Sequence, residues 1–579
     1  VGPQAQGASA ERAQAGCGGK EAMSGQDSAP EASRKAAGPV RDGLHNILLL
    51  TDSYKVAHHL QYPPGTETIY SYFECRGGAA DEVCFFGLQY YLKKYLVGSV
   101  VTPQKIDEAE RVFKGHFAST SSEPGPALFN RSGWEHILMR HGGRLPILIK
   151  AVPEGTVLPQ GNVLFSMENT DPQCYWLTSY LESLLGQVWY PTTVCTRSRE
   201  QKRIIMRYLM DTGCDSALDR GAHVFKLHDF GFRGVSSVES SALGGAAHLV
   251  NFLGGDTLSA LVLAKEFYSE PCAGSSIPSS ERSTIASWGS ERELDALRNM
   301  LEQHPTGMIA CVGDSFDSLR ACTEHLGTAL REAVEQREGL VAVRLDSGKL
   351  PETLITVLEK LESKFGHELT ETKHKLLPSC IRVLQGDGID ADSMKAILQA
   401  MMDAGWAADN VSFGSGGALL QKLQRDTLQC SFKCSHAVIG GQAVEVADGQ
   451  TAESGAPSKK GRLTLEVRGG SFVTVAEGRG DPTADILVEV FRDGRLLVDD
   501  PFEAVRLRAV GEILAPRAVE DAEGYDAAAS NSPLAEVDEA ALASEADAGG
   551  GGGGGGGGDD DEHLREYCAQ LEAAAAEAE

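Results

Sequence analysis

The chain has 579 residues, which is enough for two or more domains with substantial hydrophobic cores. Its formal net charge is −28, and an acidic chain without clustered Lys and Arg is not expected to bind nucleic acid. No apolar run approaches the roughly 18 residues that cross a bilayer, so no membrane-spanning helix is predicted.

The two ends of the chain differ in composition from the rest. Residues 1–43, rich in Ala, Gly, Ser and Gln, are predicted to be a disordered leader without the apolar segment of a secretory signal. Residues 516–579, with a glycine run at 549–558, are predicted to be a disordered acidic, Gly-rich tail. The 13 cysteines include no C-x-x-C pair, which favours reduced thiols. We predict a cytoplasmic protein, with an organelle transit peptide in the leader as the alternative.

The flanks of the remaining body, residues 44–515, predict β-structure. Short strands with turn residues are expected at 62–76 and 148–168, and again among the alternating runs and Gly/Asp turns of 462–515. We therefore predict one β-rich domain built from both ends of the body, 44–186 plus 434–515. The segment 187–433 would be inserted between them.

That inserted segment repeats one pattern, in which a short apolar strand ends at an acidic or glycine cluster and a helix follows. The predicted strands are 224–227, 308–312, 340–343, 381–384 and 411–413. Repeated strand, loop and helix units predict an α/β fold with an incomplete or irregular α/β barrel. In such barrels the loops after the strands build the active site and often bind phosphate.

One strand end carries an Arg and an Asp two residues apart, in the segment 344–348 (RLDSG). Arg344 and Asp346 share a face of the strand, so one can hold ribose or phosphate while the other orders Mg²⁺. A structural Arg–Asp pair is the alternative. Asp314 and Asp387 occupy equivalent strand ends, and three carboxylates on one face favour a metal–diphosphate site.

A glycine-rich turn, 414–420, follows the last of these strands and opens a helix. Its backbone N–H groups can cradle a phosphate, although the GxxxxGK[ST] pattern of a P-loop is absent. A simple tight turn is the alternative. Arg425 and Lys433 follow closely and supply cations.

Two further segments carry candidate binding residues. In 228–234 (HDFGFRG), Phe230 can stack on a flat heteroaromatic ring and Arg233 can meet a phosphate. A buried Phe and a salt-bridged Arg are the alternative. In 51–55 (TDSYK), Asp52 follows an apolar run, where an Asp is often a helix cap.

Taken together, these segments resemble the nicotinamide phosphoribosyltransferase family, which is related to nicotinate phosphoribosyltransferases and belongs to the type II phosphoribosyltransferases. The resemblance runs from about residue 45 to 515 and rests on the ordered set rather than on one motif. The matching segments are 51–55 (TDSYK), 71–76 (SYFECR), 86–90 (FGLQY), 168–172 (ENTDP), 228–234 (HDFGFRG), 346–348 (DSG), 385–388 (QGDG) and 414–423 (GSGGALLQKL).

The resemblance implies a homodimer with shared active sites and a magnesium-dependent reaction. Nicotinamide and phosphoribosyl diphosphate would give nicotinamide mononucleotide and diphosphate in NAD salvage. Phe230 would stack on one face of the pyridine ring, the partner subunit's Tyr54 would stack on the other, and Asp256 would accept a hydrogen bond from the carboxamide. Because a carboxylate repels nicotinate, Asp256 favours nicotinamide.

The resemblance also assigns roles to the remaining residues. Arg344, Asp346 and Asp314 are the predicted catalytic residues, and Asp314 and Asp346 would hold Mg²⁺ through water. The other predicted substrate-binding residues are Asp52, Arg76, His228, Arg233, Gly386, Asp387, Gly416, Gly417, Arg425 and Lys433.

Two departures from the family concern ATP and phosphate. Arg282 stands where the family has a histidine that ATP phosphorylates, and an Arg offers no nitrogen lone pair. We therefore predict that ATP coupling is lost or severely reduced. The family's lysine-containing loop before 458–462 is replaced by 448–453 (DGQTAE), which removes cationic support for phosphates. The alternatives are a degenerate mononucleotide-binding paralogue with little turnover and a nicotinate phosphoribosyltransferase.

Overall fold

The computed structural model describes residues 46–117, 128–447 and 458–514. The predicted leader 1–43, the predicted tail 516–579 and the substituted loop 448–453 lie outside the described residues. In the described part of the chain, no helix is both long enough and apolar enough to pass through a bilayer.

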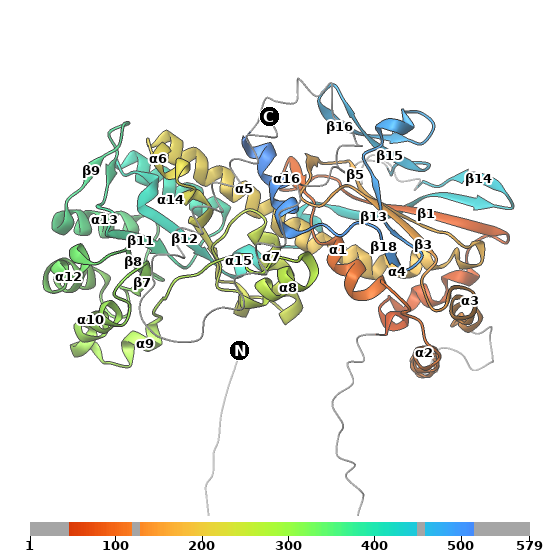
Figure 1. The fold of residues 1–579 in the computed structure, drawn as a ribbon, viewed down its shortest axis with the longest axis horizontal. Helices are drawn as coiled ribbons and strands as arrows, with labels where there is room; N and C mark the ends of the chain where they lie inside the picture. The colour runs from red at the N-terminus through yellow and green to blue at the C-terminus, as the bar shows by residue number, and fades with distance from the viewer. Residues whose placement is uncertain (1–45, 118–127, 448–457, 515–579) are drawn as a thin grey trace, which may run out of the picture. The chain divides into compact units, whose positions relative to one another are not determined.

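Seven strands form an antiparallel sheet assembled from both ends of the folded body, which confirms the predicted β-rich region (Figure 1). The first half of the body supplies β1, β3 and β5, and the last part supplies the other four strands. In sheet order the strands are β14 (Gln442–Glu445), β13 (Cys430–Ile439), β1 (Thr66–Cys75), β5 (Val163–Asn169), β3 (Ile147–Ala151), β17 (Val488–Arg492) and β18 (Arg495–Leu496).

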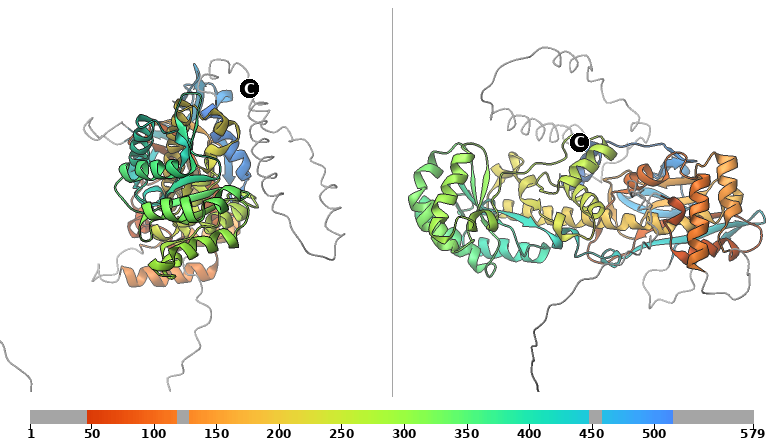
Figure 2. Two further views of the ribbon diagram at one scale, coloured as in Figure 1. Left: turned by 90° about the vertical axis from the view of Figure 1, so that its left-hand side faces the viewer. Right: turned by 90° about the horizontal axis from the view of Figure 1, so that it is seen from below.

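Five strands form a separate parallel sheet. In sheet order they are β6 (Leu227–Asp229), β12 (Val411–Ser415), β11 (Ile381–Gln385), β8 (Val341–Leu345) and β7 (Ile309–Val312). Their apolar side chains are buried on both faces, as is typical of parallel sheets covered by helices. The helices between residues 293 and 403 lie around these strands, in green to teal in Figures 1 and 2.

Isolated parallel bridges continue this sheet beyond its two edge strands. Ser279 bridges to Ala310 of β7, Ser275 to Gly254, and Gly255 to Asp229 of β6. The pairing therefore runs from β7 through two short segments back to β6, as in a barrel. The mixed α/β class is confirmed, whereas the irregularity of the barrel and the boundaries at 186/187 and 433/434 stay predictions.

Local sequence signals set the helices that flank the sheets. Thr102 caps α2 by accepting a hydrogen bond from the Lys105 N–H, and Asp390 with Ser393 forms a capping box at α14. The main α-helices are α2 (Pro103–His116), α3 (Arg131–His141), α4 (Leu177–Leu185), α5 (Trp189–Asp211), α7 (Val238–Leu249), α8 (Leu258–Tyr268), α10 (Glu293–Gln303), α13 (Glu352–Phe365), α14 (Ala391–Asp403) and α16 (Phe502–Leu514).

Two predicted strand regions are wrong in part. Residues 222–225 form a 3₁₀ turn, so the strand predicted at 224–227 begins only at Leu227. The end of the region 462–515 is the helix α16 rather than a strand. Phe502, Val505 and Ala509 are buried there at a spacing that fits one helical face.

Candidate active site

The predicted site residues converge at the carboxyl ends of the parallel strands. Asp314 follows β7, Asp346 follows β8 and Gly386 follows β11, while Arg344 lies inside β8. Carboxyl ends of neighbouring parallel strands meet at one edge of the sheet, and ligands of α/β proteins usually bind there. This edge is therefore the candidate active site.

Arg344 is the centre of the cluster. Its Nε lies 2.9 and 3.1 Å from the two carboxylate oxygens of Asp346, and its Nη1 donates to Ser279 Oγ at 3.3 Å. Its guanidinium carbon lies 4.8 Å from the centroid of the Phe230 ring, which is cation–π geometry. One largely buried cation thus joins the ends of β6 and β8.

Asp314 is held by three donors on one oxygen. Its Oδ2 accepts hydrogen bonds from the Asp346 N–H at 2.9 Å, the Ser347 hydroxyl at 2.6 Å and Arg282 Nη2 at 3.0 Å. The Asp314 side chain is only 5% exposed, whereas that of Arg282 is 48% exposed. Arg282 therefore reaches inward from the surface to neutralise a buried carboxylate.

The donor set at Asp314 fits a hydrated magnesium ion. Asp314 Oδ1 is buried and has no hydrogen-bond partner among the described residues. Asp346, whose backbone N–H donates to Asp314 Oδ2, carries a second carboxylate, which pairs with Arg344. Oxygen atoms are the ligands that Mg²⁺ prefers, and the ion usually retains several waters. Asp387, the third predicted carboxylate, is exposed at the end of β11.

Two glycines make room for this cluster. A Cβ on Gly386 would lie 2.2 Å from Asp346 Oδ1, and a Cβ on Gly414 would lie 2.1 Å from the Phe230 ring. Real Cβ atoms do not approach other atoms so closely, so any larger residue would displace Asp346 or Phe230. Gly386 therefore serves the site by its lack of a side chain.

The glycine turn after β12 lies beside the Phe230 segment. The Phe230 N–H donates to the Ser415 carbonyl at 2.9 Å, and a Cβ on Gly234 would lie 3.0 Å from the Gly417 nitrogen. The short helix Phe232–Gly234 carries exposed Arg233 next to Gly416 and Gly417. The two predicted phosphate-binding segments are thus adjacent.

His228 lies beside Phe230, and Asp256 lies beside Asp229, whose carbonyl accepts a hydrogen bond from the Asp256 N–H at 2.9 Å. The rings of His228 and Phe230 have centroids 6.2 Å apart, and Asp256 Oδ1 accepts a hydrogen bond from the Ser276 hydroxyl at 2.5 Å. Burial lowers the pKa of His228 despite the nearby Asp256 carboxylate, so the ring is neutral at neutral pH. Burial raises the pKa of Asp229, the next residue, to about 6.

The other predicted residues make their observed contacts outside this cluster. Tyr54 is 61% exposed on the 3₁₀ helix η3 (Ser53–Leu60), and Asp52 Oδ2 accepts a hydrogen bond from Ser183 Oγ at 2.5 Å. Arg76 contacts Glu74 and Ser458 beside the antiparallel sheet. Lys433 pairs in register with Tyr72 there, and Arg425 is exposed.

Sequence reasoning missed several supporting side chains. Ser279 contacts Arg344, Ser347 contacts Asp314 and Ser276 contacts Asp256. Ser347 lies in the segment 344–348 next to Asp346, and this proximity was the available signal. Ser279 and Ser276 are 65 and 20 residues away in sequence from the residues that they contact, so no local signal linked them. Glu74, only 1% exposed and ion-paired with Arg76 and Lys459, was also missed, although it lies in the segment 71–76 two residues before Arg76.

Comparisons with known proteins show the family of this chain. Residues 225–495 match the nicotinate phosphoribosyltransferase (NAPRTase) family, and residues 46–149 match the N-terminal domain of nicotinamide phosphoribosyltransferase. A relative from Xanthomonas campestris pv. campestris (strain 8004), named nicotinamide phosphoribosyltransferase, is 48% identical over 475 residues, covering 80% of this chain and 98% of the relative. The chain belongs to the nicotinamide phosphoribosyltransferase family.

More distant relatives agree with this family. A protein of the same name from Acinetobacter baylyi (strain ATCC 33305 / BD413 / ADP1) is 28% identical over 507 residues, covering 81% of this chain and 98% of the relative. The crystal structure of nicotinate-nucleotide pyrophosphorylase from Pyrococcus furiosus is similar with a TM-score of 0.50 and 13% identity, over 83% of this chain and 98% of that chain. This last likeness concerns the fold alone.

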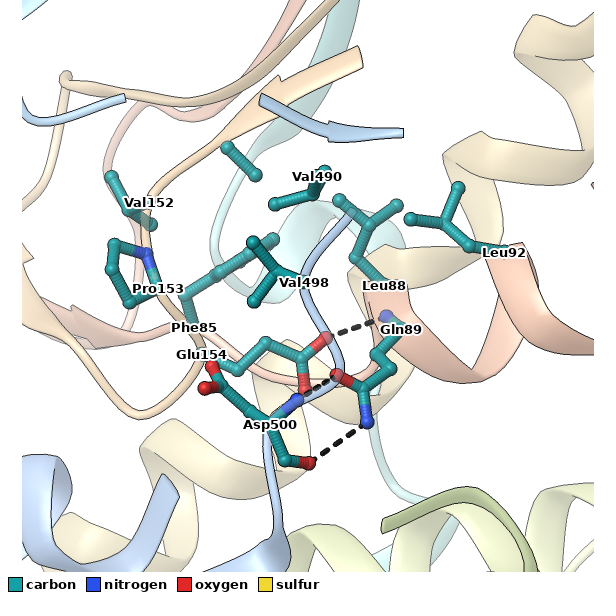
Figure 3. A pocket seen from close by; sticks show the side chains of 11 residues that line it. Phe85, Leu88, Gln89, Leu92, Val152, Pro153, Glu154, Val490, Val498 and Asp500 are labelled. Atoms are coloured by element: carbon teal, nitrogen blue, oxygen red, sulfur yellow. Dashed lines mark hydrogen bonds between the residues drawn. The ribbon is translucent and has the colours of Figure 1, made fainter. Parts of the chain in front are cut away.

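A cavity elsewhere in this family member involves a buried acid rather than the predicted substrate residues. Figure 3 shows Glu154, Gln89 and Asp500 in its lining with apolar side chains. Glu154 Oε1 accepts from the Gln89 N–H at 2.7 Å and its Oε2 accepts from the Tyr268 hydroxyl at 2.9 Å. Burial, which outweighs these hydrogen bonds, raises the pKa of Glu154 from 4.5 to about 7.

This buried carboxyl predicts a loss of stability with rising pH. Protonated Glu154 stabilises the folded state fully below pH 4.5, and the contribution is lost as the pH rises through about 7. The loss amounts to about 3 kcal/mol. Urea unfolding at a series of pH values should show that the free energy of unfolding falls less steeply with rising pH in Glu154→Gln than in the wild type. The same dependence of the free energy of unfolding on pH in this variant, the wild type and the exposed control Glu266→Gln would contradict the raised pKa of Glu154.

Proposed function

We propose that the protein is a magnesium-dependent nicotinamide phosphoribosyltransferase. It joins nicotinamide and phosphoribosyl diphosphate to form nicotinamide mononucleotide and diphosphate, a step of NAD salvage. The observation that carries the proposal is the cluster of Phe230, Arg344, Asp346 and Asp314 at one strand edge, in a chain 48% identical to a relative of that name.

The reaction requires positioning more than covalent catalysis. Phe230 stacks on the pyridine ring and holds the ring nitrogen toward the anomeric carbon of the ribose. That nitrogen forms the new bond as the bond to diphosphate breaks, through a transition state with positive charge on the sugar. Arg344 and Asp346 orient the ribose, while the Gly416–Gly417 backbone and Arg233 hold the product phosphate.

The leaving diphosphate requires cations. Mg²⁺, held through water by Asp314 and Asp346, would neutralise part of its charge. The proposed side-chain contacts of the diphosphate are three basic residues, Arg76, Arg425 and Lys433. Arg76 follows β1, Arg425 precedes β13 and Lys433 lies in β13. Asp52, His228, Gly386 and Asp387 complete the proposed substrate-binding set.

Asp256 sets the choice of substrate. Its carboxylate accepts a hydrogen bond from the nicotinamide carboxamide and repels the carboxylate of nicotinate, a like-charge contact that costs several kcal/mol. We expect the wild-type enzyme to prefer nicotinamide by at least about a hundredfold in kcat/KM, and Asp256→Asn to reduce that preference to within about tenfold. Steady-state rates with nicotinamide and with nicotinate measure this preference.

The control for this test is Asp403→Asn, which removes an exposed carboxylate at the end of α14. It should keep the wild-type preference. Faster turnover of nicotinate than of nicotinamide by the wild-type protein would contradict the proposed substrate and favour the nicotinate alternative.

Transfer without ATP coupling is the second part of the proposal. Arg282 lies where the family carries its phosphorylated histidine, and it neutralises Asp314 at 3.0 Å. A guanidinium has no lone pair to attack ATP, but it can still support the charge balance of the site. Arg282 also favours the degenerate-paralogue alternative, which predicts binding of the mononucleotide with little turnover.

The proposed assembly is a homodimer with shared sites. Exposure of the large aromatic ring of Tyr54 supports this, because the ring lies on η3 rather than at the strand edge. In the dimer, the partner subunit's Tyr54 would cover the pyridine ring opposite Phe230. We also propose that the protein is located in the cytoplasm.

A further inference from the structure

Two histidines and one aspartate meet at the end of helix α3, outside the candidate active site. His136 and His141 project from α3, and Asp171 precedes the short helix η5 (Pro172–Cys174). The Nε2 atom of each imidazole lies 2.7 Å from the same oxygen, Asp171 Oδ2. The three side chains are mostly buried, with exposed fractions of 17%, 26% and 18%.

Local structure holds these side chains in place. Helix α3 ends at His141, where Gly142 adopts the left-handed φ of 60° that terminates many helices. Asp171 Oδ1 accepts a hydrogen bond from the Gln173 N–H at 2.8 Å, and the Asp171 carbonyl accepts one from the Asn169 amide at 2.9 Å. Because the backbone occupies Oδ1, Oδ2 is the oxygen that faces both rings.

We propose that His136, His141 and Asp171 bind one divalent transition-metal ion of the zinc class. Imidazole nitrogen and carboxylate oxygen are ligands that such ions favour, and three protein ligands leave a fourth position for water. The three ligand atoms lie within 4.8 Å of one another, the one such group of His, Cys, Asp or Glu among the described residues.

The two observed distances between imidazole nitrogen and Asp171 Oδ2 need little change to accept an ion. Tetrahedral zinc with bonds of about 2.0–2.1 Å separates its ligand atoms by about 3.3 Å. Each ring therefore moves roughly half an ångström away from Asp171 Oδ2, and the ion replaces two hydrogen bonds to that oxygen. Each Nε2 must be free of its proton to bind the ion, so a neutral ring carries its proton on Nδ1 and a charged ring releases one proton.

The ion would stabilise the fold rather than take part in phosphoribosyl transfer. It ties the end of α3 to the segment that follows β5, and no residue of the proposed substrate-binding set belongs to it. A ligand that binds only the folded state raises the unfolding temperature. The protein loaded with zinc should therefore melt at a higher temperature and transfer phosphoribose at an unchanged rate.

Calorimetric titration of Zn²⁺ into the full-length, tag-free, chelator-treated protein tests the proposal. We expect one tight site per chain and a rise in Tm. His136→Gln, His141→Gln and Asp171→Asn should each weaken binding at least roughly tenfold, since loss of even an outer-shell partner has that effect. Mg²⁺, which prefers oxygen ligands, should not raise the Tm through this site.

Melting of the metal-free variants separates metal binding from folding. The amide oxygen introduced by Asp171→Asn can still accept the hydrogen bond from the Gln173 N–H, so this variant should fold without metal. The matched control is His367→Gln, because His367 Nδ1 lies 2.8 Å from Glu362 Oε1 without a second histidine. A wild-type protein that binds no Zn²⁺, or ligand variants that titrate like the wild type and His367→Gln, would overturn the proposal.

Discussion

Replacing Arg344 with Met is expected to lower kcat/KM for mononucleotide formation by about a hundred- to a thousandfold, the effect of losing one preorganised donor at developing charge. Arg344 joins several parts of the proposed site, since it contacts Asp346, Ser279 and the Phe230 ring. Its loss frees Phe230 from the cation above it and leaves Asp346 without its ion-pair partner.

Arg344→Lys separates charge from shape. Lysine keeps the positive charge but lacks the planar guanidinium that bridges Asp346 and stacks on Phe230, so an intermediate rate is expected. The matched control is Arg298→Met, which breaks an exposed ion pair with Asp295 on α10. Steady-state assays measure kcat/KM for each variant, and melting curves show whether the variant is folded. Near-wild-type kcat/KM in folded Arg344→Met would remove Arg344 from the catalytic set.

Replacing Arg282 with His is expected to create the ATP coupling that we propose is lost in the wild-type protein. An imidazole offers the nitrogen lone pair that a guanidinium does not. Asp314 Oδ2, 3.0 Å from Arg282 Nη2 in the wild type, can accept the N–H of the new ring and orient it. ATP should then leave acid-labile phosphate on Arg282→His and raise its yield of mononucleotide.

The control for this gain of function is Arg282→Gln, which removes the guanidinium without supplying a nucleophilic nitrogen. It should resemble the wild type in taking up no phosphate from labelled ATP. Acid-labile phosphate on the wild-type protein would show that another residue performs the coupling, and would contradict the role given to Arg282.

The sequence predicted the site residues at the carboxyl ends of the parallel strands better than the residues that contact them. Asp314, Asp346 and Asp387 were predicted from strand ends alone, because parallel strands bring their carboxyl ends to one edge of the sheet. The ion pair of Arg344 with Asp346 is the structural pair that the two-residue spacing on a strand offered as the alternative. Both predictions rest on local patterns, because the geometry of a strand fixes where its end lies and which side chains share a face.

Long-range contacts could not be predicted in the same way. Arg282 and Asp314 are 32 residues apart, and their ion pair depends on how the segment before α9 (Arg282–Ala286) packs beside β7. The strand predicted at 224–227 began late because residues 222–225 close into a 3₁₀ turn that apolar composition does not distinguish from a strand. His136 and Asp171 meet only through tertiary packing.

The most direct test is to measure mononucleotide and diphosphate formed from nicotinamide, phosphoribosyl diphosphate and Mg²⁺ without ATP. The proposed function predicts both products in equal amounts over many turnovers, with a yield that added ATP leaves unchanged. Bound mononucleotide without turnover at saturating substrates would contradict it and identify the chain as a binding protein.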